Sequence, residues 1–230
     1  MFDKIIFGGK HMKTSMKELL MRVVILMIGL TIAHLGVTLF ILADLGSDPF
    51  NVLVQGIYRT LSELTHWPFL THGRTHIAIC FLIIVILLFV DRSYIKIGTV
   101  LCMIFGGPII DLFTVLLTPI FALSSAFLFK LVLLALGCVI LAYGMTIVIK
   151  SDAGTGPNDL VAVVISDKSK KKFSIIRIIV DFSFVLIGFL LGGSFGIGTI
   201  VCAFCVGPVA GYFLPINEKL IGNILSKTLS

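Results

Sequence analysis

The chain has 230 residues, of which 58% are hydrophobic and only 13% are charged, and its mean hydropathy is +1.13. A soluble domain carries about a quarter charged residues, so this composition excludes a water-soluble globular protein and predicts an all-α polytopic membrane protein. The formal net charge of +6 is interpreted as a topology signal and not as a nucleic-acid-binding surface, because basic residues collect on the cytoplasmic side of membrane proteins.

Six apolar segments predict membrane-spanning helices, at residues 23–43, 76–90, 97–117, 126–149, 174–192 and 197–214. The basic segment 1–22 is expected to be a cytoplasmic leader, because the apolar run after it is too long for a signal peptide. Segment 76–90 is short for a crossing. It is kept because the cytoplasmic side then receives all 18 basic residues except Arg59, Arg74 and Lys130. Both termini, including a tail at 216–230, are expected in the cytoplasm.

The two halves of the membrane part, residues 23–118 and 119–215, repeat one another. Residues of the first half recur 108 positions later, and they include the pairs Gly36/Gly144, Asp44/Asp152, Gly46/Gly154 and Pro49/Pro157. Three spans per half is an odd number, so the second copy enters the membrane from the opposite side. Inverted repeats of this kind are common in secondary transporters, whose binding site lies between the halves. An ancient duplication without transport is the alternative.

Two polar turns, "ADLGSDPFN" (43–51) and "SDAGTGPND" (151–159), follow the first span of each half. Proline suits the first position of a helix, so a short interfacial or re-entrant helix is expected to begin at Pro49 and at Pro157, on opposite membrane faces. Free amides at a helix N-terminus bind anions. Asp48 already supplies a negative cap in the first turn, whereas the second has Gly156 there, so an anionic solute is expected at the second turn. The candidate turn residues are Asp44, Gly46, Pro49, Asp152, Gly154, Gly156, Pro157 and Asn158.

Two other interpretations of the turns stay open. Asp44 and Asp152 either hold a cation or lock each turn to its neighbours. Alternatively, the turns only break the helices, as the fold requires.

Three segments carry a resemblance to a known family: "LGVTLFILADLGSDPFNVLVQGI", "KIGTVLCMIFGGPIIDLF" and "IRIIVDFSFVLIGFLLGGSFGIGTIVCAFCVGP". They resemble the YczE/YyaS/YitT family of bacterial membrane proteins over about residues 23–215. The resemblance implies a small multi-span protein of the bacterial cytoplasmic membrane. It supplies no catalytic motif.

Ionisable residues inside spans usually face a cavity or a partner. Asp181 lies in the fifth span with Arg177 one turn earlier, and the two form either a substrate or proton site or an ion pair that fixes packing. Asp111 has no acidic counterpart in the other half, where the equivalent residue is Gly211. Because an acid without such a counterpart is more often functional than structural, Asp111 is expected to line a cavity. His34 is a proton relay, a partner for Asp111 or Asp181, or a hydrogen-bonded packing residue.

Histidines and cysteines give weaker signals. His66, His72 and His76 are assigned, with Trp67, to the outer aromatic belt, and a metal site there is not expected. The five cysteines all lie in apolar runs, which argues against a disulfide framework. Cys202 and Cys205 are interpreted as small residues at a close helix crossing, with a soft-metal or redox site as the alternative.

The expected function is a small permease for an unidentified solute, coupled to protons through Asp181 or Asp111. A substrate-binding subunit that needs an energising partner is one alternative, and an accessory membrane protein without a solute is another. The lipid bilayer and a small molecule are the expected partners, and a homo-oligomer stays open. No enzymatic activity, cofactor or metal is expected.

Overall fold

The computed structural model describes residues 15–122, 126–171 and 173–229, and the expected leader lies largely outside these residues. The described chain contains eight α-helices and a single 3-10 turn and has no strand. The helices are α2 (Met16–Ala43), α3 (Pro49–Thr65), α4 (His72–Asp91), α5 (Ile97–Ala122), α6 (Phe127–Ser151), α7 (Pro157–Ser169), α8 (Phe173–Leu190) and α9 (Ile197–Leu229), and the turn η1 (Arg92–Tyr94) follows α4.

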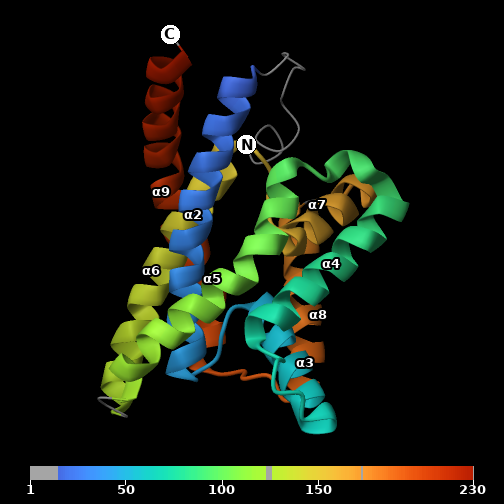
Figure 1. Cartoon of the computed structure of the whole chain (residues 1–230), viewed down its shortest axis with the longest axis vertical. Coiled ribbons are helices and arrows are strands. Elements are labelled where there is room, and N and C mark those ends of the chain that lie inside the picture. Colours follow the sequence, from blue (N-terminus) through green and yellow to red (C-terminus); the bar gives the residue numbers. More distant parts are fainter. Residues whose placement is uncertain (1–14, 123–125, 172, 230) are drawn as a thin grey trace.

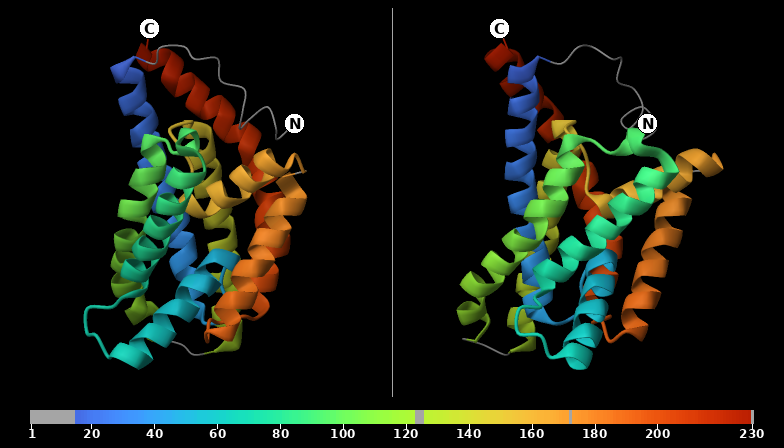
Figure 2. Two further views of the ribbon diagram at one scale, coloured as in Figure 1. Left: turned by 90° about the vertical axis from the view of Figure 1, so that its right-hand side faces the viewer. Right: turned by 45° about the vertical axis from the view of Figure 1, so that its right-hand side comes forward.

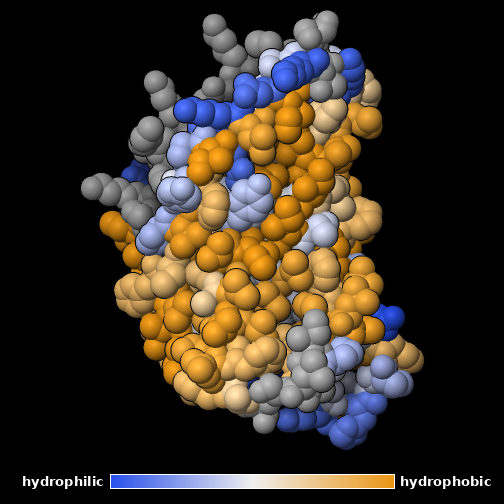
Figure 3. Space-filling view, turned by 90° about the vertical axis from the view of Figure 1, so that its left-hand side faces the viewer, coloured by the Kyte–Doolittle hydropathy of each residue, from blue (hydrophilic) through white to orange (hydrophobic). Residues whose placement is uncertain are grey.

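Within the described residues, five helices are long and apolar enough to cross a membrane: α2, α4, α5, α6 and α9. The segment that was short for a crossing, 76–90, is among them because α4 extends to 20 residues. The segment expected at 174–192 forms α8, whose described apolar part, Ile178–Leu190, is shorter. Figure 3 shows a broad apolar band between hydrophilic ends. The protein is therefore a polytopic helical membrane protein in contact with the lipid bilayer.

The helices form two groups. α2, α5, α6 and α9 pack together on one side, and α3, α4, α7 and α8 pack together on the other, with α4 against α5 between the groups (Figures 1 and 2). Each half of the sequence supplies two helices to each group. We call the end where α2 begins and α9 finishes the upper end, as in Figure 1, and the opposite end the lower end.

The first helices of the two halves, α2 and α6, cross on a seam of glycines. A Cβ atom on Gly36 would lie 2.6 Å from the carbonyl oxygen of Gly137, and one on Gly144 would lie 2.7 Å from that of Gly29. Small residues allow membrane helices to approach this closely. Gly29 and Gly36 precede Gly137 and Gly144 by the same 108 positions, so the seam repeats the internal similarity of the sequence.

The two polar turns have similar backbone conformations. Asp44 (φ 51°) and Asp152 (φ 55°) are left-handed caps that end α2 and α6, which a short polar side chain tolerates. Gly46 (φ 105°) and Gly154 (φ 146°) then redirect the chain. As the sequence predicts, Pro49 and Pro157 stand at the start of α3 and α7.

Each turn is bonded to the other half of the chain. The N–H of Gly198 at the start of α9 donates to the carbonyl of Leu45 over 2.7 Å, and that of Gly98 at the start of α5 donates to Ala153 over 2.9 Å. The first N–H groups of a helix have no partner within it. Each turn therefore caps the last helix of the opposite half.

The short helices α3 and α7 lie at opposite ends of the molecule, α3 at the lower end and α7 at the upper end (Figure 1). Residues 50–56 of α3 are all buried, as are Leu160 and residues 162–164 of α7. The beginnings of both helices are therefore packed inside the protein. The last helix, α9, continues past Pro215 to Leu229, so the segment expected as a tail is helical and packs Ile221 against α2 and α6.

Candidate functional site

One face of α4 carries polar side chains into the interior of the molecule. His72, His76 and Cys80 follow at intervals of four residues, so they lie on the same side of the helix. His76 and Cys80 are buried, with 7% and 0% of their surface exposed, and His72 is half-buried. We call these three residues the α4 stripe. It starts near the lower end and rises by about 12 Å over eight residues.

The lower end of the stripe is bonded to the start of α3. Asn51, with only 4% of its surface exposed, donates its Nδ2 to Asp48 Oδ2 over 2.7 Å. Its Oδ1 therefore acts as an acceptor, and His72 Nε2 lies 3.0 Å from it. Since the amide oxygen has no proton to give, Nε2 of His72 carries the hydrogen. Asn51 was not among the expected site residues, and His72 was expected in the outer aromatic belt.

Asp111 holds the start of α4 in place. Its two carboxylate oxygens accept from the Thr71 hydroxyl over 2.6 Å and from the N–H of Gly73 over 3.0 Å. The backbones of Gly73 and Gly107 meet so closely that neither position has room for a side chain. Asp111 thus acts as a cap on α4, next to His72, while its expected role as a cavity-lining acid stays a prediction.

The middle of the stripe meets α2. The rings of His76 and His34 lie with their centroids 5.8 Å apart at 80°, and Phe50 contacts the same His76 ring. Nδ1 of His34 is 2.9 Å from the carbonyl of Leu30. Because a carbonyl only accepts, Nδ1 carries the hydrogen and Nε2 keeps its lone pair.

The upper end of the stripe approaches α5 and α7. The Sγ atom of Cys80 lies 3.8 Å from His76 Nδ1, and the electrostatic neighbours of Cys80 are Cys102 on α5 and Asp159 on α7. Asp159 is the third residue of α7, as Asn51 is of α3, and the two are 108 positions apart. Of these equivalent residues, Asn51 therefore contacts the lower end of the stripe, and Asp159 acts through its charge on the upper end.

The remaining expected site residues lie elsewhere. Asp181 is on α8, which packs chiefly on α3 and α7, and the side chain of Arg177 lies outside the described residues. His66 is an exposed cap after α3. Cys202 is buried and Cys205 is exposed, so the two thiols do not share an environment.

At the second turn, Asn158 donates to Asp159 over 3.0 Å, and Gly156 provides no side-chain cap to α7. Anion binding at this turn stays a prediction. A surface pocket of about 400 Å³ lies instead at the first turn, between Asp44 and Gly46 on one side and Ser194 and Gly196 on the other.

Contacts between the two halves close the upper end. Asp152 binds Lys96 over 3.1 Å and Arg22 over 3.5 Å. These pairs join the turn of the second half to α2 and to the segment before α5.

A second set of upper contacts joins α7 to the end of α4. Lys168 binds Asp91 over 3.8 Å, and the Tyr94 hydroxyl donates to Asp167. That hydrogen bond raises the pKa of Tyr94 to about 12 and lowers the pKa of Asp167. We call these two sets of contacts together the upper clasp.

The lower end is closed by hydrogen bonds between α3, the first turn and the segment before α9. Arg59 donates to the carbonyl of Gly192 over 2.8 Å, and Thr60 to that of Leu191 over 2.9 Å. Ser194 donates its N–H to Gln55 over 2.8 Å and its hydroxyl to Asp44 over 2.9 Å. We call these contacts the lower clasp. The α4 stripe therefore lies between two closed ends.

Residues 20–215 match the model of a family of unknown function, DUF6198. An uncharacterized protein of Haemophilus influenzae is 30% identical over 199 residues, which cover 85% of this chain and 84% of the relative. In Bacillus subtilis, the uncharacterized membrane protein YczE is 26% identical over 92% of this chain and 94% of its own length, and the uncharacterized protein YyaS is 28% identical over 84% and 92%.

No solved structure matches the chain. The similarity to a membrane protein and the apolar helices place the protein in a bacterial membrane. The chain belongs to the family of unknown function DUF6198 and to the YczE/YyaS family of bacterial membrane proteins.

Proposed function

We propose that this protein is a small inverted-repeat permease, which moves a solute along the α4 stripe by opening its upper and lower clasps in turn. In this proposal α8 is the sixth crossing beside the five long helices, and both termini face the cytoplasm. The permease has no enzymatic activity and needs no cofactor.

Reciprocal contacts support the inverted repeat. The α2–α6 seam uses equivalent glycines from both halves, and the two turns cap each other's last helices. In addition, α3 and α7 begin inside the protein at opposite ends. Secondary transporters place their sites between such repeats, at the termini of broken helices.

The observation that carries the proposal is the burial of His76 and Asn51 within a membrane protein. Burying polar groups away from water is unfavourable unless they are bonded, and polar residues within membrane spans usually line a substrate or proton pathway. Both side chains face the interior, where α2, α3, α4 and α5 meet. Packing alone would not require His34, His72 and His76 to gather here, because apolar side chains fill such a space without the cost of burying polar groups.

The two clasps support alternating access. The upper clasp consists mainly of ion pairs and the lower one mainly of hydrogen bonds, yet they use equivalent segments of the two halves. Opening one clasp while the other stays closed would expose the stripe to one side of the membrane at a time. Proton coupling belongs to Asp181 or Asp111.

The test is solute uptake by vesicles that contain the purified protein. A panel of labelled amino acids, sugars, nucleosides, inorganic anions and metal ions is offered to the wild type, to His76→Phe and to the control His66→Gln. We expect at least one solute to enter faster than into empty vesicles, with uptake lost in His76→Phe and kept in His66→Gln. Asp181→Asn is expected to abolish the same uptake without loss of expression.

Two outcomes overturn the proposal. If no solute enters but one of them raises the melting temperature, the protein is a binding subunit that needs an energising partner. If no solute enters and none stabilises the protein, an accessory role replaces transport.

A further inference from the structure

We infer that the α4 stripe binds a soft monovalent metal cation of the class of Cu⁺ and Ag⁺, and that this cation is the solute of the permease. The statement about the solute rests on the proposed function, whereas the statement about binding stands without it. The side chains that line the stripe have the chemical type and the spacing that suit such an ion.

Two donors of the stripe already have the separation that a shared metal ion needs. The two ring nitrogens of His76 lie 3.8 and 4.0 Å from Cys80 Sγ. With zinc-like bond lengths, a metal holds its nitrogen and sulfur ligands roughly 3.5–4.4 Å apart for bond angles between tetrahedral and linear. Since Sγ is almost equally far from both nitrogens, neither in-plane lone pair points at it, and the ring has to turn about its Cβ–Cγ bond before one nitrogen and Sγ can share an ion.

The imidazole ring of His34 lies next to that of His76. His34 keeps a lone pair on Nε2, because its Nδ1–H is bonded to Leu30. A Cβ atom on Gly106 would lie 2.9 Å from His34 Nε2 and 3.0 Å from His76 Cε1. Because glycine has no side chain there, the two rings meet edge to face beside Gly106 on α5.

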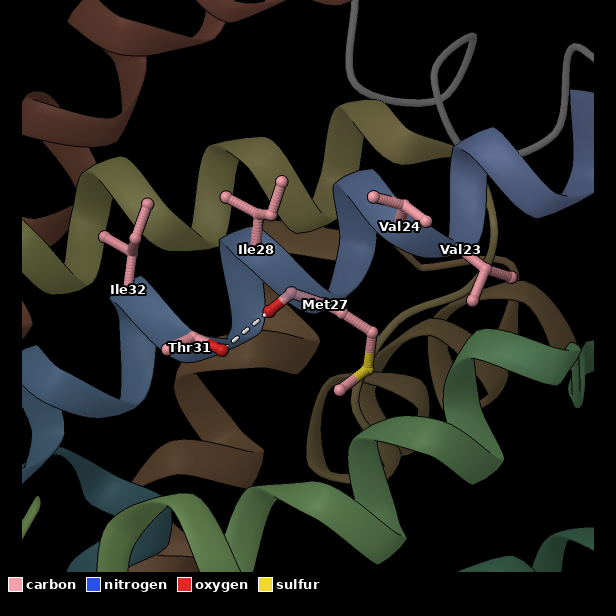
Figure 4. Close-up of a pocket in the computed structure, with 6 residues that line it drawn as sticks. All are labelled: Val23, Val24, Met27, Ile28, Thr31 and Ile32. Atoms are coloured by element: carbon pink, nitrogen blue, oxygen red, sulfur yellow. Dashed lines mark hydrogen bonds between the residues drawn. The ribbon is translucent and has the colours of Figure 1, made fainter. Parts of the chain in front are cut away.

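Sulfur donors continue the series toward the upper end. Met103 packs against the cluster that contains Cys80, and Met27 packs against the cluster that contains Cys102. In Figure 4, Met27 extends from α2 toward α5, although it also borders an outer groove of about 400 Å³ on α2. Thioether and thiol side chains thus lie in the apolar clusters next to the stripe.

The donor set selects against other cations. Na⁺, Mg²⁺ and Ca²⁺ prefer oxygen ligands, whereas the stripe offers imidazole nitrogen and thiol sulfur. The carboxylate of Asp159 acts on Cys80 and Cys102 through its charge. Zn²⁺ sites use three or four protein ligands, whereas no group of three His, Cys, Asp or Glu in the described part of the chain is arranged to hold a metal ion. Cu⁺ and Ag⁺ are soft ions that accept two nitrogen or sulfur donors.

Binding sites with only two ligands also suit transport. An ion that passes through a membrane has to bind well enough to enter and weakly enough to leave, and a closed four-ligand site would retain it. When Cys80 binds as a thiolate, the Sγ–metal bond replaces the Sγ–H bond, and the displaced proton is released to solvent. Binding at this thiol is therefore expected to release one proton per ion.

The test is the titration of Ag⁺, which needs no reductant, into detergent-purified protein. All variants carry Cys205→Ser, because the exposed Cys205 thiol would bind Ag⁺ at the surface. Cys80→Ser and His76→Gln are compared with Cys138→Ser, a buried thiol on α6, and with His66→Gln in the loop. We expect at least a tenfold loss of affinity in the first two variants and no change in the controls.

Met103→Leu keeps the side-chain volume and provides a second test if Cys80→Ser does not fold. It is expected to weaken Ag⁺ binding by a smaller factor. X-ray absorption at the copper edge of the Cu⁺-loaded protein should show both nitrogen and sulfur neighbours. Equal affinity in all variants, or a metal surrounded by oxygen, would overturn the inference.

Uptake of Ag⁺ by protein-containing vesicles separates the two proposals. Uptake that depends on Cys80 and His76 supports both. Binding without uptake leaves the metal site intact and contradicts the permease. Uptake of another solute, without Ag⁺ binding at the stripe, contradicts this inference and leaves the permease intact.

Discussion

The backbone N–H of Gly198 donates to the carbonyl oxygen of Leu45 over 2.7 Å, and this bond joins the start of α9 to the turn after α2. The bond from Gly98 to Ala153 does the same for the other half. The two halves are therefore bonded to each other at both ends of the membrane part. A change at either turn should affect the assembly of the whole bundle.

Gly46→Ala tests this connection. Gly46 has φ 105°, and an added Cβ would lie 2.6 Å from Thr199 Oγ1 and 2.7 Å from the N atom of Gly196. We expect a loss of about 1–3 kcal/mol from backbone strain alone, measured by thermal unfolding. The matched control is Gly222→Ala on α9, where the added Cβ meets nothing within 4 Å. It should raise helix stability by about 0.5–1 kcal/mol, and a similar loss in both variants would contradict the role of the turn.

Asp111→Ala tests the cap on α4. Because Asp111 accepts from Thr71 and Gly73, we expect a loss of about 0.5–2 kcal/mol, as for other helix caps. Thr71→Val should produce part of the same loss. The double variant should then lose less than the sum of the two single losses, because both remove one interaction. Strict additivity in thermal unfolding would show that the two side chains act separately.

Asn51→Ala tests the link between α3 and the stripe. The change leaves the half-buried partners Asp48 and His72 without their bonds to Asn51, and an unsatisfied buried polar group costs at most about 1–3 kcal/mol. The control is Asn223→Ala, since Asn223 is exposed on α9 and its removal should change stability by less than about 0.5 kcal/mol. If both variants melt together with the wild type, the bonds of Asn51 do not stabilise the fold.

Tyr94→Phe tests the upper clasp through its pH dependence. The pKa of Tyr94 is raised from 10.0 to about 12 by its bond to Asp167. The stabilisation of the fold by this bond is therefore complete below pH 10 and disappears as the pH rises toward 12. The pKa of Asp167 is lowered from 3.8, so its contribution is present above that value and is lost as the pH falls through the lowered pKa.

The difference in melting temperature between wild type and Tyr94→Phe should therefore be constant between about pH 5 and 9 and should shrink outside this range. A difference that does not vary from pH 3 to pH 12 would show that the hydroxyl stabilises the clasp by another route.

Local patterns in the sequence were sufficient for the helices and the turns. Apolar runs indicated all five long helices, and Pro49 and Pro157 marked the starts of the short ones. The long helices and the helix starts depend on residues that are adjacent in the sequence, so the sequence alone reveals them. The continuation of α9 was missed because Ile221 is stabilised by packing against α2 and α6, which no local pattern reveals.

The α4 stripe was harder to predict. His72 and His76 stand next to a loop with Trp67, so local composition favoured a surface position. Their direction is set by the close contact of Gly73 with Gly107, which turns this face of α4 inward. The signal available was the four-residue spacing that continues to Cys80 within an apolar run. Asn51 gave no signal by itself, because its role depends on Asp48 and His72.

The most direct test of the central claim is the access of reagents to Cys80 from both sides of the membrane. Vesicles contain a variant with Cys80 as its sole cysteine, and a membrane-impermeant methanethiosulfonate reagent is added outside or trapped inside. A matched variant retains Cys138 alone. Alternating access predicts that Cys80 is modified from either side, at a rate that a transported solute changes, and that Cys138 is protected from both. Protection of Cys80 from both sides in a protein that moves solute would contradict a pathway along the α4 stripe.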